Sequence, residues 1–97
     1  MSSPYLSQFS ISDLEGFSGV KAHTIRVWER RYNLLAPDRT GSNYRTYSLE
    51  DLKTILNVAF LVDRGIKISK VAEMSGEDRS IKIRELSHLR SENGDTL

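Results

Sequence analysis

The sequence predicts a mainly α-helical domain with a small β-hairpin, arranged as a winged helix-turn-helix. Three observations favour this fold. Two short helical segments meet at a glycine turn at Gly19-Val20, the second segment is basic, and a glycine-containing hairpin follows between residues 39 and 47. With 97 residues, the chain has room for one small core and therefore for one such domain.

Composition excludes several classes of site. The chain contains no cysteine, which rules out disulfides, thiolate zinc sites and iron–sulfur clusters, and its two histidines are too few for a histidine-rich metal site. No apolar run approaches the roughly 20 residues that span a bilayer, and the N-terminus shows no secretory signal. We therefore expect a cytoplasmic protein with no membrane partner and with no cofactor bound by these residues.

Positive charge is concentrated in one segment. Residues 21–47 hold six basic side chains against two acidic ones, a net charge of +4, although the whole chain carries only +1. Clustered Lys and Arg side chains on a near-neutral protein favour a surface that faces phosphates. A solvated helix face with chance clustering is the alternative explanation.

The first two helices are expected to pack through apolar side chains. Phe9-Ser10-Ile11 alternates in the manner of a short strand, and Ser12 is the expected N-cap of the first helix. In the second helix, Ile25 and Trp28 share one face and are expected to be buried together with Leu14. This packing leaves an outward face that consists of Lys21, Ala22, His23, Arg26, Val27 and Arg30.

The outward face of the second helix is the candidate recognition surface, because in a helix-turn-helix this helix lies in the major groove of DNA. Arg26 can offer two hydrogen bonds to guanine, and His23 and Thr24 can donate to bases or phosphates. Val27 can touch a thymine methyl group, whereas Lys21 and Arg30 are expected to bind phosphate. An ordinary helical hairpin with an inert basic face remains the alternative.

The hairpin is the candidate wing, with its turn expected at Gly41-Ser42-Asn43. Arg39 and Arg45 could reach phosphates or a neighbouring groove. Alternation places Arg45 on the same face as Tyr47, so Arg45 could be structural while Arg39 and Tyr44 make the contacts. The alternative is that Tyr44 and Tyr47 simply cover the core.

Later residues predict three more helices. Ser48 and Asp51 resemble a capping box that opens the clearest helix of the chain, which Gly65 is placed to end. Ser69 is the expected cap of a short helix that Gly76 closes. A last helix is expected from Ser80 to about Arg90, followed by an unstructured end at residues 91–97.

A set of short strings together resembles a known family. The strings are Ile11 to Leu14, Ser18 to Tyr32, Pro37, Arg39 to Gly41, Tyr44-Arg45, Tyr47-Ser48 and Asp51-Leu52. In this order they closely resemble the DNA-binding domain of MerR-type bacterial transcription regulators, over residues 9–75. Ala-His-Thr-Ile-Arg at 22–26 and Trp-Glu-Arg-Arg-Tyr at 28–32 look most like the branch that includes light- and cobalamin-responsive repressors.

The resemblance implies sequence-specific binding of double-stranded DNA at a pseudo-palindromic promoter site, with RNA polymerase as a partner and with no enzymatic activity. It also implies that Ser69–Met74 is the helix of a second wing, at whose positive N-terminal end Lys67 and Lys70 could reach phosphate. Glu15 departs from the family, which usually has a small residue there, and Gly16 follows it, so looser packing of the first helix is expected.

The resemblance also predicts how the chain is divided. Residues 1–8 are expected to be a flexible N-terminus, 9–76 a winged helix-turn-helix domain, and 77–97 a C-terminal helical segment or linker. Family members dimerise through a following helix, so the full-length protein is expected to be a homodimer. Because that helix is cut short here, these residues alone are expected to be monomeric. Any cobalamin site would lie in a separate C-terminal domain.

Two other functions are alternatives to DNA binding. A protein-interaction module could use the winged-helix surface to bind a partner or an antirepressor, and Phe60-Leu61-Val62 could supply exposed apolar surface for it. An enzyme has little support, because the Glu50/Asp51 and Glu77/Asp78 pairs fit helix starts and no nucleophile, base and orienting group occur together. His88 is expected to face solvent.

Overall fold

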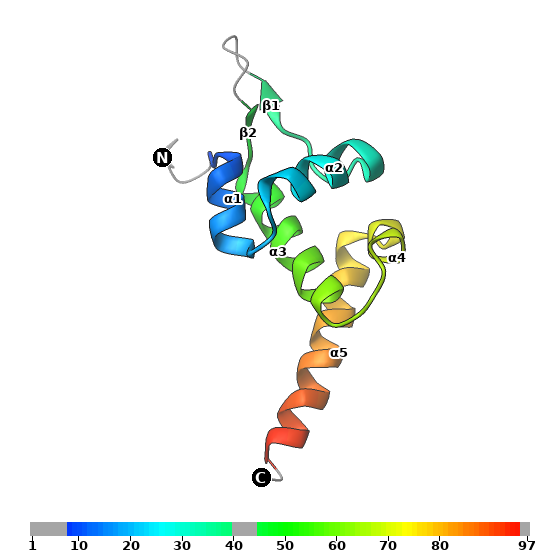
Figure 1. Ribbon diagram of the computed structural model, residues 1–97. Helices are drawn as coiled ribbons and strands as arrows, with labels where there is room; N and C mark the ends of the chain where they lie inside the picture. The colour runs from blue at the N-terminus through cyan, green and yellow to red at the C-terminus, as the bar shows by residue number, and fades with distance from the viewer. Residues whose placement is uncertain (1–7, 40–44, 96–97) are drawn as a thin grey trace.

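The computed structural model describes residues 8–39 and 45–95, which form a mainly helical fold with one two-stranded sheet (Figure 1). The helices are α1 (Ile11–Ser18), α2 (Ala22–Tyr32), α3 (Leu49–Asp63), α4 (Ile68–Glu73) and α5 (Gly76–Asp95). The strands are β1 (Asp38–Arg39) and β2 (Arg45–Thr46). Within the described ranges, no helix is long and apolar enough to cross a membrane.

Helix α1 begins with a complete capping box. The Ser10 hydroxyl accepts a hydrogen bond from the Asp13 backbone N–H at 3.0 Å, and the Asp13 carboxylate accepts one from the Ser10 N–H at 2.9 Å. The predicted cap at Ser12 is therefore wrong, since Ser12 lies inside the helix. The predicted strand at residues 9–11 is reduced to one bridge, in which the backbones of Phe9 and Tyr47 exchange two 2.8 Å hydrogen bonds.

The turn between α1 and α2 is three residues long. Gly19 adopts a left-handed conformation with φ of 78°, which a residue with a Cβ reaches only at a cost. Its N–H donates to the Glu15 carbonyl at 2.8 Å and so ends α1. Val20 is fixed by a 3.0 Å hydrogen bond from its N–H to the Ser18 hydroxyl. The chain therefore enters α2 at a defined angle.

The β-hairpin pairs its two strands antiparallel, with Asp38 opposite Thr46 and Arg39 opposite Arg45. Figure 1 shows it projecting from the helical body near the N-terminal end of α3. The predicted turn at residues 41–43 and the candidate residue Tyr44 lie outside the described residues.

The core consists of two clusters that meet at α2. The first contains Leu14, Ile25, Leu35, Tyr47, Leu52 and Ile55, and the second contains Val58, Leu61 and Val71. Trp28 and Leu34 pack against both clusters. Because α3 contributes to each cluster, it is the common support of the helix-turn-helix and of α4.

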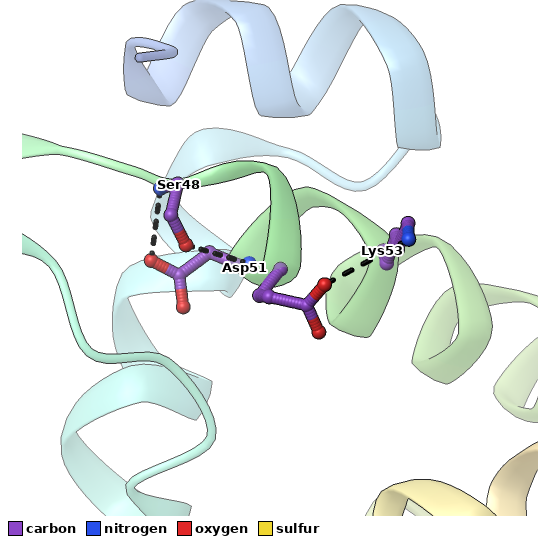
Figure 2. Close-up of polar contacts among 4 residues, drawn as sticks. Ser48, Asp51 and Lys53 are labelled. Atoms are coloured by element: carbon purple, nitrogen blue, oxygen red, sulfur yellow. Dashed lines mark hydrogen bonds and ion pairs between the residues drawn. The ribbon is translucent and has the colours of Figure 1, made fainter. Parts of the chain in front are cut away.

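The predicted capping box at the start of α3 is confirmed (Figure 2). The Ser48 hydroxyl accepts from the Asp51 N–H, and the Asp51 carboxylate accepts from the Ser48 N–H, each at 3.1 Å. Asp51 is buried, and its second oxygen accepts from the Ala36 N–H at 3.1 Å. One carboxylate thus caps α3 and also ties down the segment that leaves α2. Gly65, with φ of 96°, follows the end of α3 as predicted.

The boundaries of α4 and α5 differ from the prediction. Lys67, not Ser69, is the N-cap of α4, because Lys67 adopts the extended conformation that precedes a helix. Gly76 opens α5 instead of closing α4, since the Ser75 hydroxyl caps the first turn by accepting from the Asp78 N–H at 3.0 Å. Helix α5 therefore starts before Ser80, extends to Asp95 and leads away from the other helices (Figure 1).

Substituting Asp51 tests how the α3 cap holds the fold. Asp51→Ala removes the reciprocal cap and leaves the Ala36 N–H without this acceptor, so the free energy of unfolding should fall by about 2 kcal/mol. Glu50→Ala is the matched control, because the Glu50 side chain is 84% exposed and pairs with exposed Lys53 at 3.7 Å. It should cost about 0.5 kcal/mol or less. If urea unfolding shows the same loss of unfolding free energy for both variants, Asp51 does not have the capping role assigned to it.

Candidate nucleic-acid interface

Helix α2 turns its apolar side inward and its basic side outward. Ile25 is fully buried and Trp28 is half-buried between the two core clusters. The exposed residues of this segment include the predicted contact residues Lys21, His23, Arg26 and Arg30. Thr24 and Val27 are half-buried, so they lie at the margin of the exposed surface. The burial pattern on which the recognition hypothesis depends is therefore present, while contact with DNA stays a prediction.

The N-terminal end of α2 is capped from α1. Lys21, the N-cap residue, makes no side-chain cap hydrogen bond. Instead, the Glu15 carboxylate accepts a hydrogen bond from the Ala22 N–H at 3.0 Å. Glu15, where the sequence suggested looser packing, thus makes a specific contact between the two helices. Capping patterns in sequence span three residues, so a contact over seven residues gave no signal.

The C-terminal part of α2 is held by the hairpin. The Tyr47 hydroxyl donates to the Glu29 carboxylate at 2.8 Å, and the Tyr47 side chain is only 1% exposed. Tyr47 follows β2 directly and belongs to the first core cluster. The expectation that Tyr47 covers the core is therefore met, and the same residue also links the hairpin to the predicted recognition helix.

Two of the three candidate residues of the hairpin, Arg39 and Arg45, have described backbones. The backbones of Arg39 and Arg45 lie directly opposite each other in the ladder. This arrangement keeps both residues as candidates for phosphate contacts.

Helix α4 carries a second pair of basic candidates. Lys67 and Lys70 are exposed, while Val71 between α3 and α5 is fully buried. Val71 shares its cluster with Trp28, so α2 and α4 are joined through the core. The shared core therefore holds α2 and α4, which both carry basic candidate residues, in fixed positions relative to each other.

Arg79 of α5 holds the C-terminal end of α4 by hydrogen bonds. The sequence did not predict this role. Its Nε donates to the Val71 carbonyl at 3.0 Å, and its Nη2 donates to the Ala72 carbonyl at 3.4 Å. These carbonyls lie in the last turn of α4, where a helix has unpaired acceptors and a partial negative charge. The side chain is 8% exposed, and desolvation by this burial lowers the pKa of Arg79. Arginine keeps its charge at neutral pH because its ordinary pKa is so high.

Three further features concern metal binding, His88 and the apolar residues 60–62. In the described part of the chain, no group of three or more His, Asp or Glu side chains could hold a metal ion. His88 is exposed, as expected. The apolar surface suggested at residues 60–62 is only partly exposed, because Leu61 is fully buried and its two neighbours are half-buried. The most exposed large apolar side chain among the described residues is instead Phe17, at 63%.

Comparison with known families identifies the arrangement. The family described as MerR HTH family regulatory protein matches residues 9–77. The chain belongs to the MerR family. The repressor CarH of Myxococcus xanthus is 40% identical over 57 residues, which cover 59% of this chain and 19% of CarH. The regulator MlrA of Escherichia coli is 30% identical over 66 residues, which cover 68% of this chain and 27% of MlrA.

Solved MerR structures share the fold. A MerR family regulator, HiNmlR, bound to promoter DNA matches with a TM-score of 0.63 over 92% of this chain and 75% of its own, at 17% identity. A MerR family regulator from Bacillus cereus matches with a TM-score of 0.61. The helical MerR fold predicted from the sequence is thus confirmed. The chain spans about a fifth of the length of CarH and about a quarter of that of MlrA.

Replacing Arg79 tests the support of α4. Arg79→Met keeps the aliphatic bulk but leaves the Val71 and Ala72 carbonyls without this donor, so the free energy of unfolding should fall by about 1–3 kcal/mol. Arg84→Met is the matched control on the exposed side of α5 and should change it by about 0.5 kcal/mol or less. Urea unfolding measures the change in the free energy of unfolding for each variant. Amide exchange of Arg79→Met should show that protection is lost mainly in α4. Unchanged protection of α4 would contradict this role.

Proposed function

We propose that this MerR domain reads double-stranded DNA with α2 in the major groove. One observation carries the proposal: complete burial of Ile25 leaves Arg26 and His23 on the exposed side of a helix with a clear basic character. In a helix-turn-helix, this is the side that meets base edges. The HiNmlR structure, which has the same fold and was determined bound to promoter DNA, supports DNA binding by a domain of this fold.

The proposed contacts divide by chemistry. Arg26 is exposed and suited to a bidentate pair with guanine, while His23 and Thr24 donate to bases or phosphates. Val27, at the margin of the surface, is suited to a thymine methyl group. The proposed phosphate contacts are Lys21, Arg30, Arg39, Tyr44, Arg45, Lys67 and Lys70. In this arrangement the β-hairpin acts as a wing beside α2, and α4 acts as the second wing.

The full-length regulator is proposed to act in the bacterial cytoplasm as a homodimer on a two-fold-related promoter site, where RNA polymerase also binds. A dimer with two copies of α2 would match the symmetry of such a site. No cofactor is assigned to these residues; a cobalamin-binding unit would belong to a separate domain. The relatives' names include repressors and regulators, which supports a role in transcription control without assigning its direction.

Selection from random double-stranded oligonucleotides tests the function. We expect enrichment of a defined half-site and, for a protein able to dimerise, of paired half-sites. Binding should weaken steeply as salt rises, because phosphate contacts release counterions. No enrichment over the input pool would refute the proposal. If adding duplex DNA shifts none of the NMR signals of α2, a partner-binding surface is favoured instead.

The reading role of Arg26 has its own test. Arg26→Ala should weaken binding to the selected site by about 1–3 kcal/mol and relax the sequence preference at one position. Lys82→Ala is the charge-matched control, because Lys82 lies on α5, which leads away from α2 (Figure 1). Fluorescence anisotropy with selected and position-by-position altered duplexes measures both effects. Unchanged preference at every position would show that Arg26 does not read a base.

A further inference from the structure

The contact between Glu15 and α2 differs from the other caps in the fold. Ser10 and Ser48 cap the helices that follow them directly, whereas Glu15 reaches from the middle of α1 to the first N–H of the next helix. The first four N–H groups of any helix lack partners within it. Since Lys21 supplies no side-chain cap, Glu15 takes this role for α2.

The position of this contact relates it to recognition. Ala22 lies between Lys21 and His23, both exposed, and Arg26 lies one turn further along the same helix. A small tilt or fraying of the first turn would therefore move the side chains that meet base edges. The other part of α2 is held separately, because Tyr47 binds Glu29. Loss of the Glu15 contact should therefore disturb α2 at its first turn and leave its far end in place.

We infer that Glu15 is a positioning residue for DNA recognition: its carboxylate fixes the first turn of α2 and thereby sets how well the domain distinguishes its site from other DNA. This inference rests on the proposed function. A carboxylate is a fitting group for the task, since negative charge is favourable at the positive N-terminal end of a helix. It also occupies a backbone N–H that could otherwise bind a phosphate of any sequence.

The measured quantity is the ratio of the dissociation constants for a non-specific duplex and for the selected site, at one salt concentration. Glu15→Ala should lower this ratio about fivefold, as expected from the loss of one helix cap at the reading surface. Glu15→Gln keeps an acceptor of the same reach, so it should retain the ratio within about twofold. Its lost negative charge strengthens binding to all DNA alike and cancels in the ratio.

A stability effect has to be separated from a positioning effect. Ser10→Ala is the matched control, because it removes the α1 capping box and leaves the Glu15 contact intact. It should lower the melting temperature by an amount similar to Glu15→Ala but leave the ratio unchanged. Glu15→Asp keeps the charge on a side chain one methylene shorter and should lower the ratio as Glu15→Ala does; it replaces that variant if the alanine protein does not fold.

The outcomes are distinct. If the wild-type domain does not discriminate between the two duplexes, the proposed function fails and this inference fails with it. If the wild type discriminates and Glu15→Ala and Glu15→Asp keep the full ratio, the inference alone is overturned. An equal loss of the ratio in Ser10→Ala would overturn it too, by showing a general effect of α1 stability. Faster amide exchange at Ala22 and His23 in Glu15→Asp, with Glu29 to Tyr32 unchanged, would support it independently of DNA.

Discussion

The structure depends on the burial of Ile25 between α1 and α3. Ile25 lies in the same apolar cluster as Leu14 and Ile55, and all three side chains are fully buried. Burying a side chain of this size contributes about 1.5–3 kcal/mol, which fixes the rotation of α2 about its own axis. Since residues of a helix are tied to one rotation, the exposure of His23 and Arg26 follows from that burial.

Polar contacts then set the details that apolar packing leaves free. Glu15 holds the start of α2, Glu29 and Tyr47 connect its other part to the hairpin, and Asp51 binds the segment that leaves it. Each carboxylate satisfies a donor that would otherwise be unpaired in a partly buried place. Packing thus decides which side of α2 faces out, and these hydrogen bonds tie its two parts and the segment after it to neighbouring elements.

Helix α4 is likewise held by apolar packing on one hand and by polar contacts on the other. Val71 packs into a cluster that also contacts Trp28, which joins α4 to α2 through the core. Arg79 reaches from α5 to the last carbonyls of α4, so the direction of α5 and the placement of α4 are coupled by charged hydrogen bonds. A helix of six residues has little stability of its own, and its position depends on such support.

The sequence by itself determined the MerR fold, the buried face of α2 and the cap at Asp51, because helical periodicity and capping are local and act within a few residues. It misplaced the starts of α1, α4 and α5, where several serines and a glycine offered competing local signals. Only the tertiary structure decided that Glu15 caps α2 and that Arg79 binds α4. Both contacts join separate helices, and their geometry exists only after those helices have packed.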